Sequence, residues 1–337
     1  MTELQTFHLP DSVEDTESHV HLAYDMMHAW ERDGIFQVAM PPVQSRKAHN
    51  AIDSGKRFFR LPTDVKLGRI SDLTYSGYAA SDTGESFTVC PDVALTDSRV
   101  QAKWPCHGPV PWPDECYRRD LVAFLAELTA IGDKLLKLTA LGLELTDTTS
   151  LTNLARDGWH HLRSLRFPAR SALAALDTGA RTDDGLLVLA YQDDAGGLHV
   201  RPPVEGEKRN RNWLLGESTA GGYENEEPWL FVRPVPDVLT VYPGDMMQFV
   251  TDGALLATPH KAHLNTIEQF TIVYCHEPGF NACVHPLLDP TSTDYLHYGT
   301  HFTSTFMRAN PDRSTTLRIR SEDRLTILDR LRQTATR

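Results

Sequence analysis

The hydrophobic pattern of this chain changes its period near residue 160, and this change restricts the fold more than any other feature. Before that point, apolar residues recur at helical spacing, most clearly over 114–145. After it, the chain consists of short β-rich segments bounded by turns, at 161–169, 185–193, 197–203, 229–245 and 270–278. Such segments are typical of a β-sandwich or barrel. We therefore expect a mainly β core with flanking helices.

The N-terminal half is predicted to be largely helical. Asp11 and Ser12 are candidate caps for its first helix, which Gly34 would end. The expected elements are a helix over 14–33, a strand over 35–40, a helix over 45–62 and loops with short strands over 71–112.

No linker separates two domains in this sequence, so we expect a single domain over 1–337. A polar insertion at 207–227 interrupts the strands, and Ser321 is expected to cap a final helix over 321–335. The predicted regions are a helical N-terminal part (1–155), a β core (156–285) and a C-terminal loop and helix (286–337).

Composition excludes several classes of function. The net charge of −12 argues against general binding to nucleic acid or to anionic membranes. Five irregularly spaced cysteines without a CxxC pair predict neither a disulfide framework nor a zinc ribbon. The N-terminus has no apolar run, and no stretch reaches the length of a membrane span. We expect a cytoplasmic monomer in a reducing setting.

Two segments carry the pattern of an iron oxygenase core: RTDDGLLVLAYQDDAGGLHVRPP (181–203) and TVYPGDMMQFVTDGALLATPHKAHLNTIEQFTIVYCHEPGF (240–280). Through these two segments, the chain resembles the ethylene-forming-enzyme branch of the 2-oxoglutarate/Fe(II) oxygenases. This branch is related more distantly to isopenicillin N synthase. Further similar strings are SDLTYSGYAAS (71–81), WPCHGPVPWP (104–113), LLKLTALGLEL (135–145), RDGWHHLRSLRFP (156–168) and RPPVEGEKRNRNWLLGES (201–218). The resemblance implies a double-stranded β-helix, or jelly-roll, core. It also implies Fe(II), 2-oxoglutarate and, in the namesake enzyme, L-arginine.

The metal site that the resemblance implies is incomplete in this sequence. Such a site needs two His and one carboxylate, which leave open positions for co-substrate and oxygen. The resemblance gives Asp183 and His260 as two of these ligands and places Arg181 at the position of the first His. A guanidinium stays protonated and cannot ligate iron. We therefore expect Fe(II) binding to be weakened.

The co-substrate and substrate positions also depart from the family. The Arg that pairs with the far carboxylate of 2-oxoglutarate corresponds to Gln269, and the aromatic after the iron-binding Asp corresponds to Asp184. Gln269 supplies no charge, and a charge-assisted hydrogen bond is worth about 1.5–3 kcal/mol against about 1 for a neutral one. Binding of 2-oxoglutarate is thus disfavoured. The acidic loop of the arginine pocket is shortened to SDTGESF (81–87). Arg163 and Arg308 match family positions that face carboxylates, and Phe306 is a further candidate substrate contact.

Several local arrangements are compatible with these residues. Arg181 and Asp183 have alternate spacing on a presumed strand, so an ion pair between them near His260 is the favoured arrangement. On the same alternation, Asp184 would face the other way. His199 or His263 could instead provide a replacement ligand.

Three hypotheses for function follow from these residues. The favoured one is an enzyme of oxygenase descent with altered chemistry, for which Arg181, Asp183 and His260 are the catalytic candidates. Its substrate would be a small carboxylate-bearing or amino-acid-like molecule, held by Arg163 and Arg308. The second hypothesis is a non-catalytic descendant that binds a small molecule or a partner protein. The third is a working Fe(II)/2-oxoglutarate oxygenase with a shifted ligand set.

Overall fold

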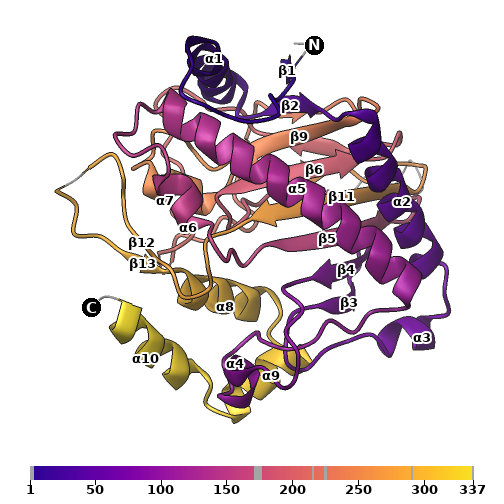
Figure 1. Ribbon diagram of the computed structural model, residues 1–337. Coiled ribbons are helices and arrows are strands. Elements are labelled where there is room, and N and C mark those ends of the chain that lie inside the picture. The colour runs from indigo at the N-terminus through magenta and orange to yellow at the C-terminus, as the bar shows by residue number, and fades with distance from the viewer. Residues whose placement is uncertain (1–3, 171–176, 215, 224–225, 290, 336–337) are drawn as a thin grey trace.

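An eight-stranded sheet forms the centre of the protein (Figure 1). The computed structural model describes residues 4–170, 177–214, 216–223, 226–289 and 291–335. Strand order in this major sheet is β1-β2-β9-β6-β11-β5-β4-β3, and only β1 and β2 pair in parallel. The strands are β1 (Thr6–Phe7), β2 (Phe36–Ala39), β3 (Gly77–Ala80), β4 (Glu85–Val89), β5 (His161–Phe167), β6 (Leu187–Gln192), β9 (Val238–Pro243) and β11 (Gln269–His276).

A minor sheet has the order β10-β7-β8 and is built from β7 (Leu198–Val200), β8 (Leu230–Phe231) and β10 (His260–Ala262). The two sheets share one core layer, because Val188 and Ala190 of β6 pack with Val200 of β7. The alternate residues of β6, such as Leu187 and Leu189, belong to the cluster on the opposite face. This period-two division follows from the pleat of the strand. A separate hairpin pairs β12 (Cys283–Val284) with β13 (Leu296–His297).

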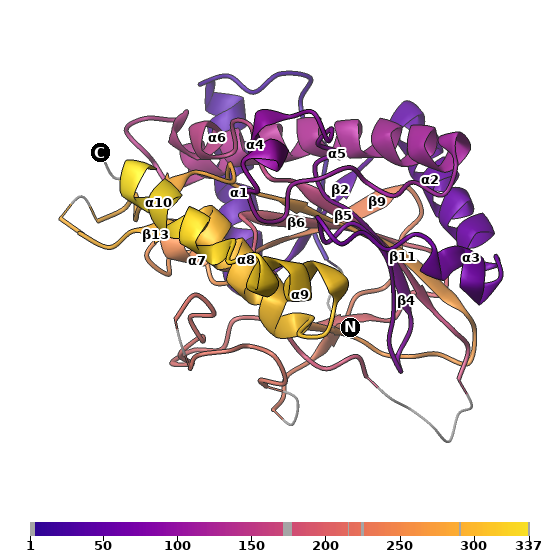
Figure 2. The same cartoon turned by 90° about the horizontal axis from the view of Figure 1, so that it is seen from below.

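Helices cover the outer face of the major sheet. The long helix α5 (Glu115–Gly142) crosses this face, with α1 (Glu17–Asp33) and α2 (Pro42–Phe59) packed beside it (Figures 1 and 2). Asp114 caps α5 by accepting a hydrogen bond from the backbone N–H of Tyr117. Shorter helices are α3 (Thr63–Leu67), α4 (Ser98–Gln101), α6 (Ser150–Leu154) and α7 (Asp245–Val250).

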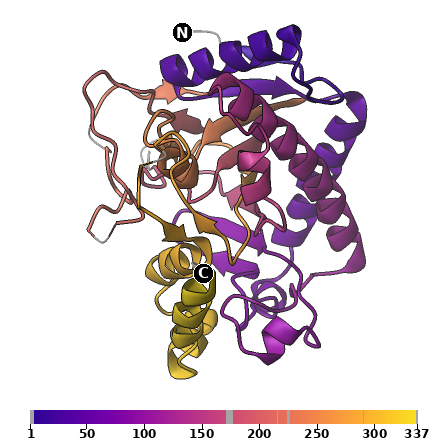
Figure 3. The ribbon, with the colours of Figure 1, turned by 60° about the vertical axis from the view of Figure 1, so that its left-hand side comes forward.

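Three C-terminal helices gather at the end of the molecule remote from α1 (Figure 3). They are α8 (Tyr298–Ala309), α9 (Ser314–Ser321) and α10 (Leu325–Ala335). The prediction that Ser321 begins the last helix was wrong: Ser321 is the last residue of α9, and α10 starts at Leu325. The first helix is likewise capped by Thr16 rather than by Asp11 or Ser12. Its predicted end was right, because Gly34 adopts the left-handed conformation (φ 72°) that favours glycine.

Most elements expected from the change of period are present, including the long helix and the strands near 161, 185, 197, 229 and 270. The predicted insertion at 207–227 contains no helix or strand within the described part of that range, which omits residues 215 and 224–225. Among the described residues, we find no helix with the length and apolar character that crossing a membrane requires.

Candidate functional site

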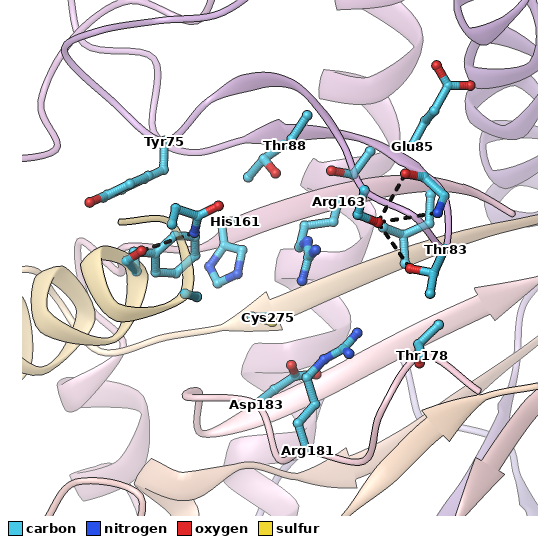
Figure 4. A pocket seen from close by; sticks show the side chains of 18 of the residues that line it. Tyr75, Thr83, Glu85, Thr88, His161, Arg163, Thr178, Arg181, Asp183 and Cys275 are labelled. Atoms are coloured by element: carbon cyan, nitrogen blue, oxygen red, sulfur yellow. Dashed lines mark hydrogen bonds between the residues drawn. The ribbon is translucent and has the colours of Figure 1, made fainter. Parts of the chain in front are cut away.

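A cavity of about 530 Å³ opens between β4, β5, the segment 178–184 and the end of α8. It continues into a smaller space that reaches His260, and the two spaces share Arg163, Arg181 and Asp183. Figure 4 shows Arg163 on β5 and Arg181 on the facing segment, with their side chains directed into the space between them. The cavity therefore has cationic groups on two opposite walls.

Backbone pairing fixes the place of Arg181. It forms an isolated antiparallel bridge with His260, in which each N–H donates to the carbonyl oxygen of the other, at 3.1 and 2.9 Å. The chain then leaves the bridge and turns, and the carbonyls of Asp183 and Asp184 accept hydrogen bonds from the first backbone N–H groups of α7. Residues 182–184 are thus not a strand, so the expected alternation of side chains between two faces does not apply to them.

Asp183 contacts His260 instead of Arg181. Its Oδ2 lies 3.4 Å from His260 Nε2, and no ion pair within 4.0 Å joins Arg181 to Asp183 in the described chain. The predicted Arg181–Asp183 ion pair was therefore wrong, because the turn after Arg181 directs the carboxylate toward the imidazole. Burial tends to raise the pKa of Asp183, but the nearby His260, Arg181 and Arg163 lower it overall. Burial lowers the pKa of His260, which favours the neutral imidazole.

The two facing guanidinium groups lack partners in the part of the chain that the structure describes. Neither Arg163 nor Arg181 makes a side-chain hydrogen bond or an ion pair within 4.0 Å to another described residue. Burial, and then the charge of Arg181, lowers the pKa of Arg163. Asp183 lies near both cations, and the carboxylates of Glu85 and Asp184 also line the cavity, so its walls carry charges of both signs.

A third guanidinium that the sequence reasoning missed lines the same cavity. Arg313, between α8 and α9, donates to the carbonyls of Tyr75 and Ser76 at 3.3 and 2.9 Å. The ring of Phe306 also lines the cavity, 5.0 Å from that of Tyr75. That Phe306 contacts a substrate stays a prediction. The sequence after Phe306 does not distinguish Arg313 from Arg308, because the approach of Arg313 to residues 75–78 depends on tertiary folding.

Two other predicted residues lie apart from this cavity. Arg308 is exposed on α8, where it contacts Thr305 Oγ1 and the carbonyl of Asn212, and it lines neither space. Gln269 is 1% exposed, and its amide donates to the carbonyls of Gly196 and His263 at 2.7 and 2.9 Å. The structure thus does not bring Arg308 or Gln269 together with Arg163.

Comparison with known proteins places this arrangement in a family. The profile described as the 2OG-Fe(II) oxygenase superfamily matches residues 160–278, and that of the N-terminal region of the non-haem dioxygenase in morphine synthesis matches residues 4–115. A 2-oxoglutarate-dependent ethylene/succinate-forming enzyme of Ralstonia nicotianae is 51% identical over 329 residues, which cover 95% of each chain. The protein belongs to the 2OG-Fe(II) oxygenase superfamily, in its ethylene-forming-enzyme-like branch.

Solved structures of other proteins share the fold of this chain. A full-length Neurospora crassa protein in complex with alpha-KG and thymine is similar with a TM-score of 0.72 and 17% identity, covering 91% of this chain and 97% of that one. A putative 2OG-Fe(II) oxygenase family protein of Caulobacter crescentus has a TM-score of 0.71 and 16% identity, covering 91% and 100%. The expected jelly-roll core with flanking helices is confirmed.

The superfamily implies Fe(II) and 2-oxoglutarate, and two residues of this chain fit part of an iron site. Asp183 and His260 supply one carboxylate and one imidazole at the spacing of two ligands of one ion. No third His, Cys, Asp or Glu in the described ranges brings a ligand atom within 4.8 Å of both. The alternative ligands His199 and His263 are engaged elsewhere: His263 Nδ1 lies 2.8 Å from Asp177, and His199 Nδ1 lies 3.1 Å from the carbonyl of Gly197.

Asp184 belongs to a second polar cluster beside the cavity. Its Oδ1 lies 3.5 Å from Nε2 of His301 on α8, and Asp245 at the start of α7 completes the group. Burial, and then the charge of Asp184, raises the pKa of Asp245 to about 7. Strand alternation predicted that Asp184 would face away from Asp183, but residues 182–184 are not a strand and both residues line the cavity. Their nearest charged contacts differ, because Asp183 lies beside His260 and Asp184 beside His301.

Proposed function

We propose that this oxygenase-family protein binds a small carboxylate-bearing molecule between Arg163 and Arg181, and that it acts on this molecule by chemistry different from that of its ethylene-forming relatives. One observation carries the proposal: two half-buried guanidinium groups face one cavity without side-chain partners among the described residues. Partly buried cations are costly unless anions meet them. Asp183 lies near both guanidinium groups and balances at most one of them.

The carboxylate of an organic acid suits this geometry. Each guanidinium offers a planar set of N–H donors that matches two carboxylate oxygens. The aromatic rings of Tyr75 and Phe306 supply an apolar wall in the same cavity, which suits the carbon skeleton of a keto acid or an amino acid. The proposed ligand is therefore an organic acid, with its carboxylate between Arg163 and Arg181.

We further propose that Arg181 takes the place of a metal ligand and weakens Fe(II) binding at Asp183 and His260. Its guanidinium offers no lone pair, and its charge opposes a nearby dication. The amide of Gln269 is occupied by backbone carbonyls, so it has no free donor for a distal carboxylate. These two features disfavour both contacts that would hold 2-oxoglutarate. One is chelation of the metal, and the other is pairing of its far carboxylate with a cation.

A thermal-shift screen of amino acids and keto acids, with chelator present, tests the proposal. We expect at least one carboxylate to stabilise the protein, and Arg163→Gln to weaken its binding by about tenfold or more, equivalent to about 1.4 kcal/mol. Arg308→Gln is the matched control, because Arg308 is exposed outside the cavity. Absence of any stabilising carboxylate, or equal binding by the Arg163→Gln variant, would refute the proposed pocket.

A second candidate function is retained oxygenase activity, favoured by the 3.4 Å approach of Asp183 to His260. It predicts ethylene release from 2-oxoglutarate with Fe(II) and L-arginine under air. We expect no release above that of an Asp183→Asn variant. Robust release by the unmodified chain would favour this second candidate over the first.

A further inference from the structure

A buried group of two carboxylates and one imidazole lies beside the cavity, on three separate elements. Asp184 comes from the turn after Arg181, Asp245 is the first residue of α7, and His301 is in the first turns of α8. Their ligand atoms all lie within 4.8 Å of one another. The three residues are 9%, 0% and 7% exposed, so the group is almost fully removed from water.

Two members of this cluster lack hydrogen-bond partners in the described chain. Nε2 of His301 is buried and has no hydrogen-bond partner, and its 3.5 Å contact with Asp184 is not a hydrogen bond. The carboxylate of Asp184 accepts no hydrogen bond from a described residue either. Buried polar groups in native proteins are nearly always satisfied, and unpaired buried charges are costly. The buried, unpartnered nitrogen of His301 therefore points to a ligand that binds beside it, within reach of the Asp184 carboxylate.

The spacing of these groups suits a metal ion. Two atoms about 2.1–2.2 Å from one ion lie roughly 3.0 Å apart at the right angle of octahedral coordination and roughly 3.5 Å apart at an angle near 110°. Asp184 Oδ1 lies 3.5 Å from His301 Nε2, so one ion can reach both after a small adjustment. Asp245 is already oriented, because Thr182 and Asn212 donate hydrogen bonds to its two oxygens at 2.7 and 2.9 Å. Hydrogen bonds of this kind commonly hold metal-ligating carboxylates in position.

We propose that Asp184, Asp245 and His301 bind a divalent first-row transition metal ion, with Mn²⁺ or Fe²⁺ as the best match to two carboxylates and one imidazole. Asp184 also lines the cavity, so an ion can enter from that side. The site is separate from Asp183 and His260, with which it shares no ligand. It does not depend on carboxylate binding by Arg163 and Arg181, so either proposal can fail alone.

Electron paramagnetic resonance of added Mn²⁺ tests this site in the full chain after treatment with chelator. We expect one bound Mn²⁺ per chain, and a loss of affinity of about tenfold or more in both Asp184→Asn and His301→Gln. His260→Gln should keep the bound ion, because His260 lies outside the cluster. Glu277→Gln is a second control, since Glu277 is a fully buried carboxylate in the neighbouring group with His161 and Cys275.

Circular dichroism and thermal melting without metal establish that each variant is folded. Should His301→Gln fail to fold, the decision rests on Asp184→Asn, whose side chain keeps its size. The proposal is overturned if the unmodified chain binds no Mn²⁺. It is equally overturned if the ion is lost in His260→Gln or Glu277→Gln while the Asp184 and His301 variants retain it.

Discussion

Arg181 and His260 face each other as the two members of one antiparallel backbone bridge, with N–H···O distances of 3.1 and 2.9 Å in the two directions. The side chain at position 181 therefore starts beside the imidazole that the family resemblance assigns to iron. A guanidinium at this position brings a fixed positive charge where a third neutral ligand would complete a metal site.

Replacement of this cation by an imidazole should restore metal binding. We expect Arg181→His to bind one more equivalent of Mn²⁺ than the unmodified chain, because a third donor joins Asp183 and His260. Titration followed by electron paramagnetic resonance measures the stoichiometry. Arg308→His adds an imidazole at an exposed site outside the cavity and should leave the stoichiometry unchanged. An unchanged stoichiometry in Arg181→His would show that Arg181 does not limit metal binding at Asp183 and His260.

Gln269 should contribute to stability and not to ligand affinity. Its side chain donates to two backbone carbonyls and accepts from the backbone N–H of Asn265. We expect Gln269→Ala to lower the free energy of unfolding by about 1–3 kcal/mol, with carboxylate affinity unchanged within about twofold. Urea denaturation and calorimetry measure the two quantities. Gln101→Ala, at an exposed position, should change the unfolding free energy by less than about 0.5 kcal/mol. A large loss of affinity in Gln269→Ala would instead place this residue in the ligand site.

His107 should make the protein less stable in mild acid. Burial lowers its pKa to about 4, against about 6.5 in an unfolded chain. Between these two pH values the unfolded state binds the proton and the folded state does not, so stability falls as pH decreases from about 6.5 to about 4. The loss from this group is about 3 kcal/mol by proton linkage.

The variant His107→Phe tests this contribution. The difference in unfolding free energy between pH 7 and pH 4.5 should be smaller in this variant than in the unmodified chain. The exposed His21 provides the control, because His21→Phe should leave that difference unchanged. Equal pH dependence in all three proteins would contradict the assignment to His107.

The sequence predicted the fold well because its signals are local. The apolar residues of α5 recur at helical spacing, and the alternation along β6 divides its side chains between two core clusters. The Arg181–Asp183 ion pair failed for a local reason too: a turn begins where strand alternation was assumed. The gathering of Asp184, Asp245 and His301 depends on how α7 and α8 approach that turn, and no sequence spacing encodes this approach.

Arg308 and Arg313 show the same limit. Both lie in one basic stretch of the sequence, but only Arg313 lines the cavity, because its backbone position between α8 and α9 directs it toward residues 75–78. The family resemblance favoured Arg308, which lies exposed on α8. The family resemblance therefore identified the right region of the chain. The positions of α8 and α9 then determine that Arg313, and not Arg308, faces the cavity.

The affinity of the best-stabilising carboxylate, measured by calorimetry with excess chelator and again with anaerobic Fe(II), tests the central claim most directly. If Arg163 and Arg181 hold the carboxylate, the two dissociation constants should agree within about twofold, and Arg181→Gln should weaken binding by about tenfold or more under both conditions. Binding that appears only with Fe(II), and that survives in Arg181→Gln, would contradict the account.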